Sequence, residues 1–188
     1  KTTLLTAASS TGALLGFLVA ARWLAQGQDP YRMAARGILA GIAAFSAVIF
    51  AAPLGSAALA FAGAALIGFG GGLFGVSTLT VAMTLPAGGA AGAGLALGAW
   101  GAAQATAQGL SIFIGGSVRD GVGHMATAGA LGPGLTDPSL GYSFVYHLEI
   151  GLLFATLAVP GPMVRVRPLP TTTQDQTAGG LRLTEFPT

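Results

Sequence analysis

Long apolar runs separated by short polar connectors make up most of the first 165 residues. No charged residue occurs between Arg36 and Arg119. A helix needs about 20 predominantly apolar residues to cross a bilayer, so this uncharged stretch can hold three crossings if turns divide it. Turns are predicted at residues 53–56 and 86–94. The pattern predicts five spans, at about residues 4–23, 37–54, 57–85, 94–118 and 142–159.

Composition supports a membrane setting, because 53% of the residues are hydrophobic and only 7% are charged. The predicted fold is therefore an all-α polytopic membrane protein, with residues 1–165 as its transmembrane domain. Residues 119–141, between the last two spans, are too polar to cross the bilayer. Residues 166–188 combine Pro, Thr, Gln and Gly with scattered charge, which predicts a disordered tail.

Glycines are concentrated in the third span, where residues 68–83 read GFGGGLFGVSTLTVAM. In a water-soluble helix each glycine costs roughly 1 kcal/mol relative to alanine. In a bilayer, glycine instead lets two helix backbones touch, so we expect this segment to pack closely against its neighbours. Glycine pairs spaced four residues apart recur along the chain, although 31 glycines make the pattern weakly specific. The pairs are Gly12/Gly16, Gly37/Gly41, Gly68/Gly72, Gly71/Gly75 and Gly94/Gly98.

The positions of the basic residues predict the orientation of the chain. Basic residues near span ends remain in the cytoplasm. The first connector and the C-terminal end carry Arg22, Arg32, Arg36, Arg165 and Arg167, against Lys1 and Arg119 on the other side. The C-terminus, with residues 166–188, is therefore expected to be cytoplasmic.

The start of the chain suggests a missing segment. The span count is odd and residue 1 is not Met, so we expect further helices before Lys1. A signal peptide is a rival interpretation of the first apolar run. It is disfavoured because Arg22-Trp23 follows the run, where a cleavage site would have small residues.

Several kinds of chemistry have no motif in this chain. It has no cysteine, which excludes disulfides, thiol nucleophiles and cysteine-ligated metals. His124 and His147 are too far apart in sequence for a zinc motif, and no HExxH or GxSxG occurs. The glycines of residues 68–75 lack the lysine of a phosphate loop. We expect no enzymatic activity, no metal site and no nucleic-acid partner.

A glutamate and a histidine lie in the fifth span. Glu149 falls near its middle, and an ionisable group at bilayer depth suggests a function. It shares a helix face with Tyr146 and could pair with it, whereas His147 points elsewhere. Glu149 either fixes helix packing or handles a proton, a substrate or a pigment. His147 either bonds to the backbone or ligates the magnesium of a chlorophyll-type pigment through a ring nitrogen.

The fourth span carries a polar stripe that includes Gln104 and Gln108, with Thr106 and Ser111 nearby. The two glutamines are four residues apart and so share a helix face. They either form hydrogen bonds between helices or line a central cavity. The candidate pigment-binding residues are His147, Glu149, Gln104 and Gln108.

Seven motifs follow one another along the chain, including GLFGVSTLTVAM, GLALGAWGAAQATAQG and GGSVRDG. They lie at residues 2–6, 27–32, 72–83, 94–109, 115–121, 146–153 and 161–165. In this order they resemble the PucC/LhaA family, the bacteriochlorophyll-delivery branch of the major facilitator superfamily. The resemblance covers nearly everything up to Arg165.

The resemblance implies a bundle of twelve helices, of which this chain would hold the eighth to the twelfth. It also implies an assembly factor for light-harvesting complexes in the inner, intracytoplasmic photosynthetic membrane of a purple bacterium. Its partners would be antenna polypeptides and the reaction centre–antenna complex, with bacteriochlorophyll as the delivered pigment. The alternative is a proton-coupled transporter of a small solute that uses Glu149. The first seven helices of the family would lie outside this chain, which leaves open whether it has the central cavity that forms between the two six-helix halves.

Overall fold

The computed structural model describes residues 2–84 and 89–159, and in this part of the chain every regular element is a helix. The all-helical prediction is therefore confirmed. The predicted tail at 166–188 and the first part of the predicted turn at 86–94 lie outside the described residues. The helices are α1 (Thr2–Ala25), α2 (Pro30–Ala51), α3 (Ala57–Thr84), α4 (Gly89–Thr127) and α5 (Leu140–Ala158).

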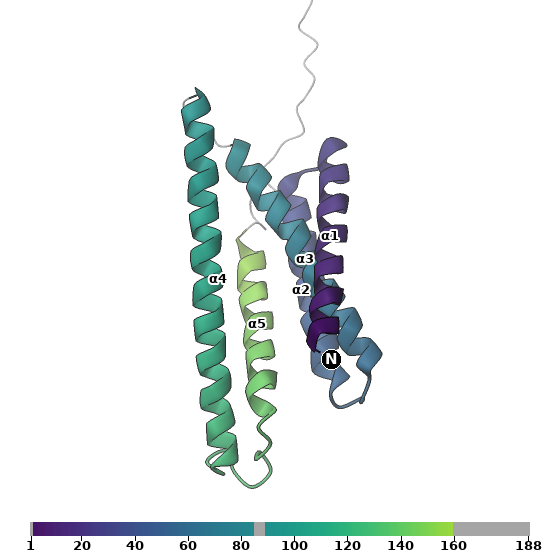
Figure 1. The fold of residues 1–188 in the computed structure, drawn as a ribbon, viewed down its shortest axis with the longest axis vertical. Helices are drawn as coiled ribbons and strands as arrows, with labels where there is room; N and C mark the ends of the chain where they lie inside the picture. Colours follow the sequence, from purple (N-terminus) through teal and green to yellow (C-terminus); the bar gives the residue numbers. More distant parts are fainter. Residues whose placement is uncertain (1, 85–88, 160–188) are drawn as a thin grey trace, which may run out of the picture.

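The helices form two groups, with α1, α2 and α3 packed together and α4 and α5 paired beside them (Figure 1). Among the described residues, α1, α2, α3 and α5 are long and apolar enough to cross a membrane. The chain is accordingly a membrane protein with several apolar helices. The fourth predicted span does not reach the same hydropathy, because it contains two glutamines and several glycines.

The second helix begins earlier than predicted and is long enough to span. The Asp29 carboxylate accepts a hydrogen bond from the Tyr31 backbone N–H at 2.8 Å, and Pro30 occupies the first turn. The carboxylate thus binds a backbone N–H of the first turn that has no partner within the helix, and Pro30 already has a φ close to the helical value. The preceding turn contains Gly27 at φ +78°, a conformation that favours glycine. The 22 residues of α2 are enough to cross a bilayer.

The helix that contains the fourth predicted span is longer than that span, since α4 begins at Gly89 and continues to Thr127. Residues 89–94, predicted as part of a turn, are therefore helical. Arg119 and Asp120 mark a change of polarity, but neither interrupts a helix. The helix closes at Gly129, at φ +73°, where the Ala130 N–H donates to the Met125 carbonyl at 3.0 Å. At about 1.5 Å per residue, the 39 residues extend roughly 58 Å, well beyond a hydrocarbon core of about 30 Å.

Glycines allow α3 to touch both α1 and α2 at backbone distance. A Cβ atom at Gly72 would lie 2.6 Å from the Ala13 carbonyl oxygen and 3.2 Å from the Gly16 Cα of α1. A Cβ at Gly70 would lie 2.7 Å from the Gly37 carbonyl oxygen of α2. Side chains at these positions would push the helices apart, so the glycines are required by the packing. The predicted pairs Gly12/Gly16, Gly37/Gly41 and Gly68/Gly72 are confirmed as contact positions.

Two other predicted glycine pairs do not pack against a helix. Among the described residues, no atom lies within 4 Å of a Cβ placed at Gly71 or Gly75, or at Gly94 or Gly98. Residues 68, 70 and 72 contact the backbones of α1 and α2, whereas residues 71 and 75 lie on a different side of α3. Of these five glycines, Gly68, Gly71, Gly72 and Gly75 all border one cavity. Spacing along one helix therefore did not distinguish the packed side of α3 from its open side.

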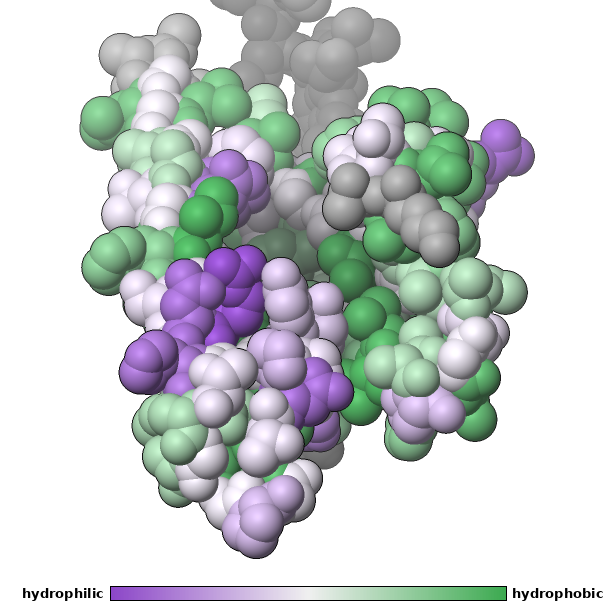
Figure 2. Space-filling view, turned by 60° about the horizontal axis from the view of Figure 1, so that its bottom comes forward, coloured by the Kyte–Doolittle hydropathy of each residue, from purple (hydrophilic) through white to green (hydrophobic). Residues whose placement is uncertain are grey.

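The base of the α4–α5 hairpin is polar and tightly packed. The Arg119 guanidinium donates to the Tyr142 hydroxyl at 3.2 Å and to the Asp120 carboxylate at 2.6 Å, and it lies over the Tyr142 ring. Gly141 is buried against the Arg119 carbonyl. Figure 2 shows hydrophilic residues gathered at this end of the molecule, whereas much of the remaining visible surface is apolar. The GGSVRDG motif lies within α4, and its Arg119 thus contacts the start of α5.

Candidate functional site

A cavity of about 610 Å³ lies between α1, α3 and α4. We call it the α3–α4 groove and define it by Gly71 and Gly75 of α3 and by Trp100, Gln104 and Gln108 of α4. The two glutamines share a face, as predicted, and they border a cavity. Neither makes a hydrogen bond within the described part of the chain, so no interhelical bond occupies them.

One side-chain hydrogen bond crosses from α4 to α3 at this groove. The Trp100 indole N–H donates to the Thr78 hydroxyl at 3.3 Å, and that hydroxyl donates to the Phe74 carbonyl at 2.9 Å. No titratable side chain is among the described residues that border the groove. Its polar groups are amides and an indole, which can bind a backbone or a ring substituent but do not exchange protons near neutral pH. Thr106 and Ser111 are exposed and do not border it.

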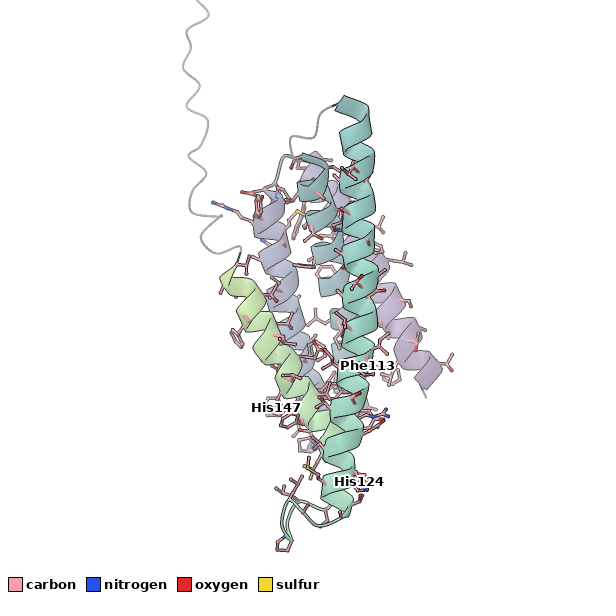
Figure 3. The ribbon with its side chains drawn as sticks, turned by 90° about the vertical axis from the view of Figure 1, so that its left-hand side faces the viewer. Phe113, His124 and His147 are labelled. Carbon is pink, nitrogen blue, oxygen red and sulfur yellow. The ribbon has the colours of Figure 1, made fainter. Side chains whose placement is uncertain are left out.

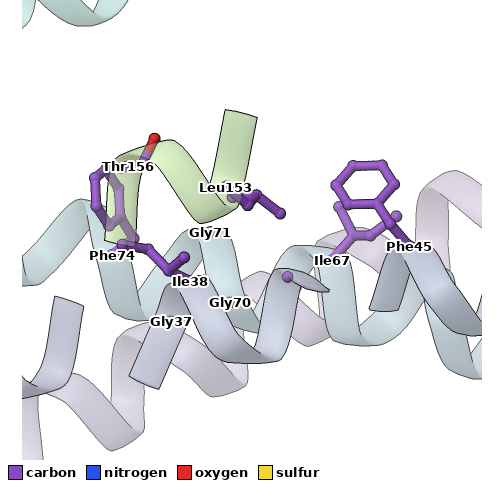
Figure 4. Close-up of a pocket in the computed structure, with 10 residues that line it drawn as sticks. Gly37, Ile38, Phe45, Ile67, Gly70, Gly71, Phe74, Leu153 and Thr156 are labelled. Carbon is purple, nitrogen blue, oxygen red and sulfur yellow. The ribbon is translucent and has the colours of Figure 1, made fainter. Parts of the chain in front are cut away.

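Two smaller apolar cavities separate α5 from α2 and α3. Their volumes are about 280 and 490 Å³, and both are bordered by Phe74 and Thr156. Figure 4 shows the smaller one, with Phe45, Ile67 and Leu153 around it. These cavities were not predicted from the sequence, because they depend on how α5 docks against the other helices.

Glu149 lies on the inward side of α5. Val145, four residues before it, is the nearest neighbour of Gly115 in α4, and Leu153, four residues after it, packs at Gly41 of α2. Residues four apart share a helix face, so Glu149 lies between the contacts with these two helices. It is half-buried and makes no hydrogen bond or ion pair with any described residue.

The suggested pairing of Tyr146 with Glu149 does not form. The Tyr146 ring instead packs against Phe45 of α2, with ring centroids 6.0 Å apart and tilted by 39°. Tyr146 therefore contributes to the contact between α2 and α5, and the Glu149 carboxyl is left without a partner among the described residues.

If the chain has the antenna-assembly role that the family resemblance implies, we expect Glu149→Gln to leave antenna assembly and protein abundance nearly unchanged. Burying an ionised carboxylate at bilayer depth costs at least about 2.5 kcal/mol, so a packing role favours a neutral group, and glutamine keeps a donor and an acceptor. Antenna absorbance and membrane abundance should be measured together. Normal abundance without antenna would instead show that the carboxyl group itself is needed.

His147 lies on a different side of α5 from Glu149, as predicted. It is exposed, and its Nδ1 lies 2.7 Å from the Ser143 carbonyl oxygen. The backbone-bonded alternative is thus confirmed for one ring nitrogen, while Nε2 has no hydrogen-bond partner in the described ranges. Figure 3 shows His147 part-way along α5 and His124 nearer the far end of α4. Among the described residues, no three His, Asp or Glu side chains group as metal ligands.

The connector before α5 has its own polar anchor. The Ser139 backbone N–H donates to the Asp137 carboxylate at 2.8 Å, and this bond lowers the pKa of the Asp137 carboxyl from its ordinary value. The turn precedes Leu140, where α5 begins, and so helps to set the position of the helix and of His147 upon it.

The four candidate residues occupy three places. Gln104 and Gln108 border the α3–α4 groove, Glu149 lies inside the bundle, and His147 lies on the outer side of α5. The Trp100–Thr78 contact and the open side of α3 were not predicted from the sequence. The recurrence of Trp100, Gln104 and Gln108 at intervals of four was the available signal for a shared polar face.

Comparisons with known proteins support one family. The profile described as PUCC protein matches residues 1–167. A Rhodobacter capsulatus protein named "Uncharacterized protein in puhA-bchM intergenic region" is 55% identical over 188 residues, which are 100% of this chain and 39% of that protein. "Protein PucC" of Cereibacter sphaeroides is 42% identical over 165 residues, covering 88% of this chain and 34% of the relative.

The chain therefore spans between about a third and two fifths of the length of these relatives. No solved structure matches the chain. The match over residues 1–167 and the two identities agree, and the chain belongs to the PUCC protein family.

Proposed function

We propose that the protein is an assembly factor for photosynthetic light-harvesting complexes, which binds antenna polypeptides and delivers bacteriochlorophyll to them. The observation that carries this proposal is the α3–α4 groove, which is large, mostly apolar and free of titratable side chains among its described residues. Membership of the PUCC protein family supports a role connected with photosynthetic complexes.

The groove has the features of a surface that receives a membrane helix. Gly71 and Gly75 are four residues apart and have no neighbour within 4 Å, so another backbone can approach them closely. Gln104 and Gln108 on the opposite side have unused donors and acceptors, which can bond to polar groups of an incoming polypeptide. A small antenna polypeptide with one apolar helix fits this combination.

The superfamily resemblance adds an arrangement in the membrane. The five helices correspond to the eighth to the twelfth of a facilitator-type bundle, so the groove would face the other half of the protein. The C-terminus would be cytoplasmic, and the polar base of the α4–α5 hairpin would lie on the periplasmic side of the photosynthetic membrane. The protein would bring its partners together without catalysing a reaction.

A secondary transporter of a small solute is the second candidate. The observation that favours it is Glu149, which is half-buried and has no partner among the described residues, as a proton-coupling group would be. Glu149 does not border the α3–α4 groove, however, so a solute bound there would not contact the carboxyl. The assembly role therefore accounts for more of the geometry.

Purification of the tagged, full-length protein from cells that make antenna tests the proposal. We expect antenna polypeptides and a near-infrared pigment band to elute with it, and both to be absent from a mock purification of untagged cells. Elution without antenna polypeptides, together with solute uptake that depends on a proton gradient, would contradict the assembly role and favour transport.

A further inference from the structure

An exposed histidine and open space occur together on one side of α5. We define the outer face of α5 by Leu140, Phe144, His147, Gly151 and Phe154, which helical spacing places within one sector. The Ser143 carbonyl oxygen can only accept, so the 2.7 Å contact places the ring proton of His147 on Nδ1. In the neutral form of the ring Nε2 then carries the lone pair, and no described residue hydrogen-bonds to it.

The surroundings of His147 are apolar and leave room for a flat group. Phe144 is 55% exposed and Phe154 57% exposed. One turn beyond His147, Gly151 is exposed and a Cβ placed there would have no atom within 4 Å. On the other side, the connector residues Leu131 and Leu135 help to enclose an apolar cavity of about 230 Å³ that His147 borders.

We propose that the outer face of α5 binds a magnesium tetrapyrrole of the chlorophyll type, with Nε2 of His147 as the axial ligand of the magnesium. This inference rests on the proposed function and names a place for the pigment. A neutral imidazole nitrogen is a common metal ligand, and a carbonyl that accepts from the other nitrogen orients the ring for it. Gly151 leaves space for the macrocycle, and the exposed Phe144 and Phe154 rings supply apolar contact.

The ligand count favours a tetrapyrrole over a bare metal ion. A metal ion held by protein side chains needs several of them, and no such group of three occurs in the described part of the chain. A magnesium ion that already has four ring nitrogens needs only one more ligand, which His147 can supply. A lipid chain would cover the same apolar face but would gain nothing from the lone pair of Nε2.

Titration of the purified, full-length protein with bacteriochlorophyll a and with magnesium-free bacteriopheophytin a tests this site. We expect wild type to bind the magnesium pigment at least about tenfold more tightly, equivalent to about 1.4 kcal/mol. His147→Leu should abolish the preference, and Gly151→Leu should weaken binding of both pigments. Resonance Raman spectra should show five-coordinate magnesium only where His147 is present.

Matched controls separate the site from general effects of substitution. His124→Leu removes the other histidine, and Gly98→Leu adds the same side chain at a glycine of α4 that also has no neighbour within 4 Å. Both should bind like wild type, and all variants should reach normal abundance in the membrane.

Equal affinity for the two pigments would show apolar adsorption only and would overturn the proposed site, as would an unchanged preference in His147→Leu. Antenna polypeptides that still elute with the protein would then leave the assembly role standing. A wild-type protein that neither prefers the magnesium pigment nor elutes with antenna polypeptides would contradict both proposals.

Discussion

Gly72→Leu is expected to remove most of the protein from the membrane, whereas Gly75→Leu is expected to leave its abundance near normal. The leucine at position 72 would meet the Ala13 carbonyl and the Gly16 Cα, both backbone atoms of α1 that no side-chain rotation can move. Overpacking a close contact costs roughly 1–3 kcal/mol and sometimes more, and a backbone contact lies at the upper end. At position 75 the same side chain enters open space.

Immunoblots of membranes and thermal unfolding of the detergent-purified variants measure this difference. Because both substitutions add the same side chain to α3 three residues apart, helix propensity and hydrophobicity are matched. Equal abundance and equal stability of the two variants would mean that α1 and α3 do not meet at Gly72.

The double substitution Gly71→Phe and Gly75→Phe is expected to give a protein that accumulates but no longer supports antenna assembly. Both glycines have free space around them, so the folded bundle tolerates the added rings. The rings would occupy the α3–α4 groove and exclude a partner helix. Antenna absorbance should fall to near the level of a deletion strain while the abundance of the variant stays close to wild type.

Gly98→Phe is the matched control, since Gly98 also has free space but does not border the groove. It should retain wild-type antenna absorbance. Normal antenna in the double variant would show that the groove is not where the partner binds.

The sequence predicted most of the fold because apolar runs and turns carry the information for membrane helices. The predicted third span, 57–85, differs from α3 by one residue. The fourth predicted span ends just before Arg119 and Asp120, while the helix that contains it continues to Thr127, shortly before Gly129 adopts a left-handed conformation. Charged residues in the sequence indicate where a span leaves the membrane, but the helix can continue past that point.

The candidate site was predictable only within single helices. Helical periodicity correctly placed Gln104 and Gln108, four residues apart, on one face. It also placed His147 and Glu149, two residues apart, on different faces. It did not predict the open side of α3 at Gly71 and Gly75, because that depends on the positions of α1, α2 and α4 around it. It also suggested a Tyr146–Glu149 pair, although Tyr146 packs on Phe45 of another helix.

Photo-crosslinking from the α3–α4 groove tests the central claim most directly. A photoreactive amino acid would replace Gln104, which borders the groove, or Thr106, which is exposed and does not border it, in the full-length protein. After illumination of cells that are making antenna, the variant at position 104 should capture an antenna polypeptide that mass spectrometry identifies, and the variant at position 106 should not. Equal capture from both positions, or no capture from position 104 while antenna assembles normally, would contradict the account.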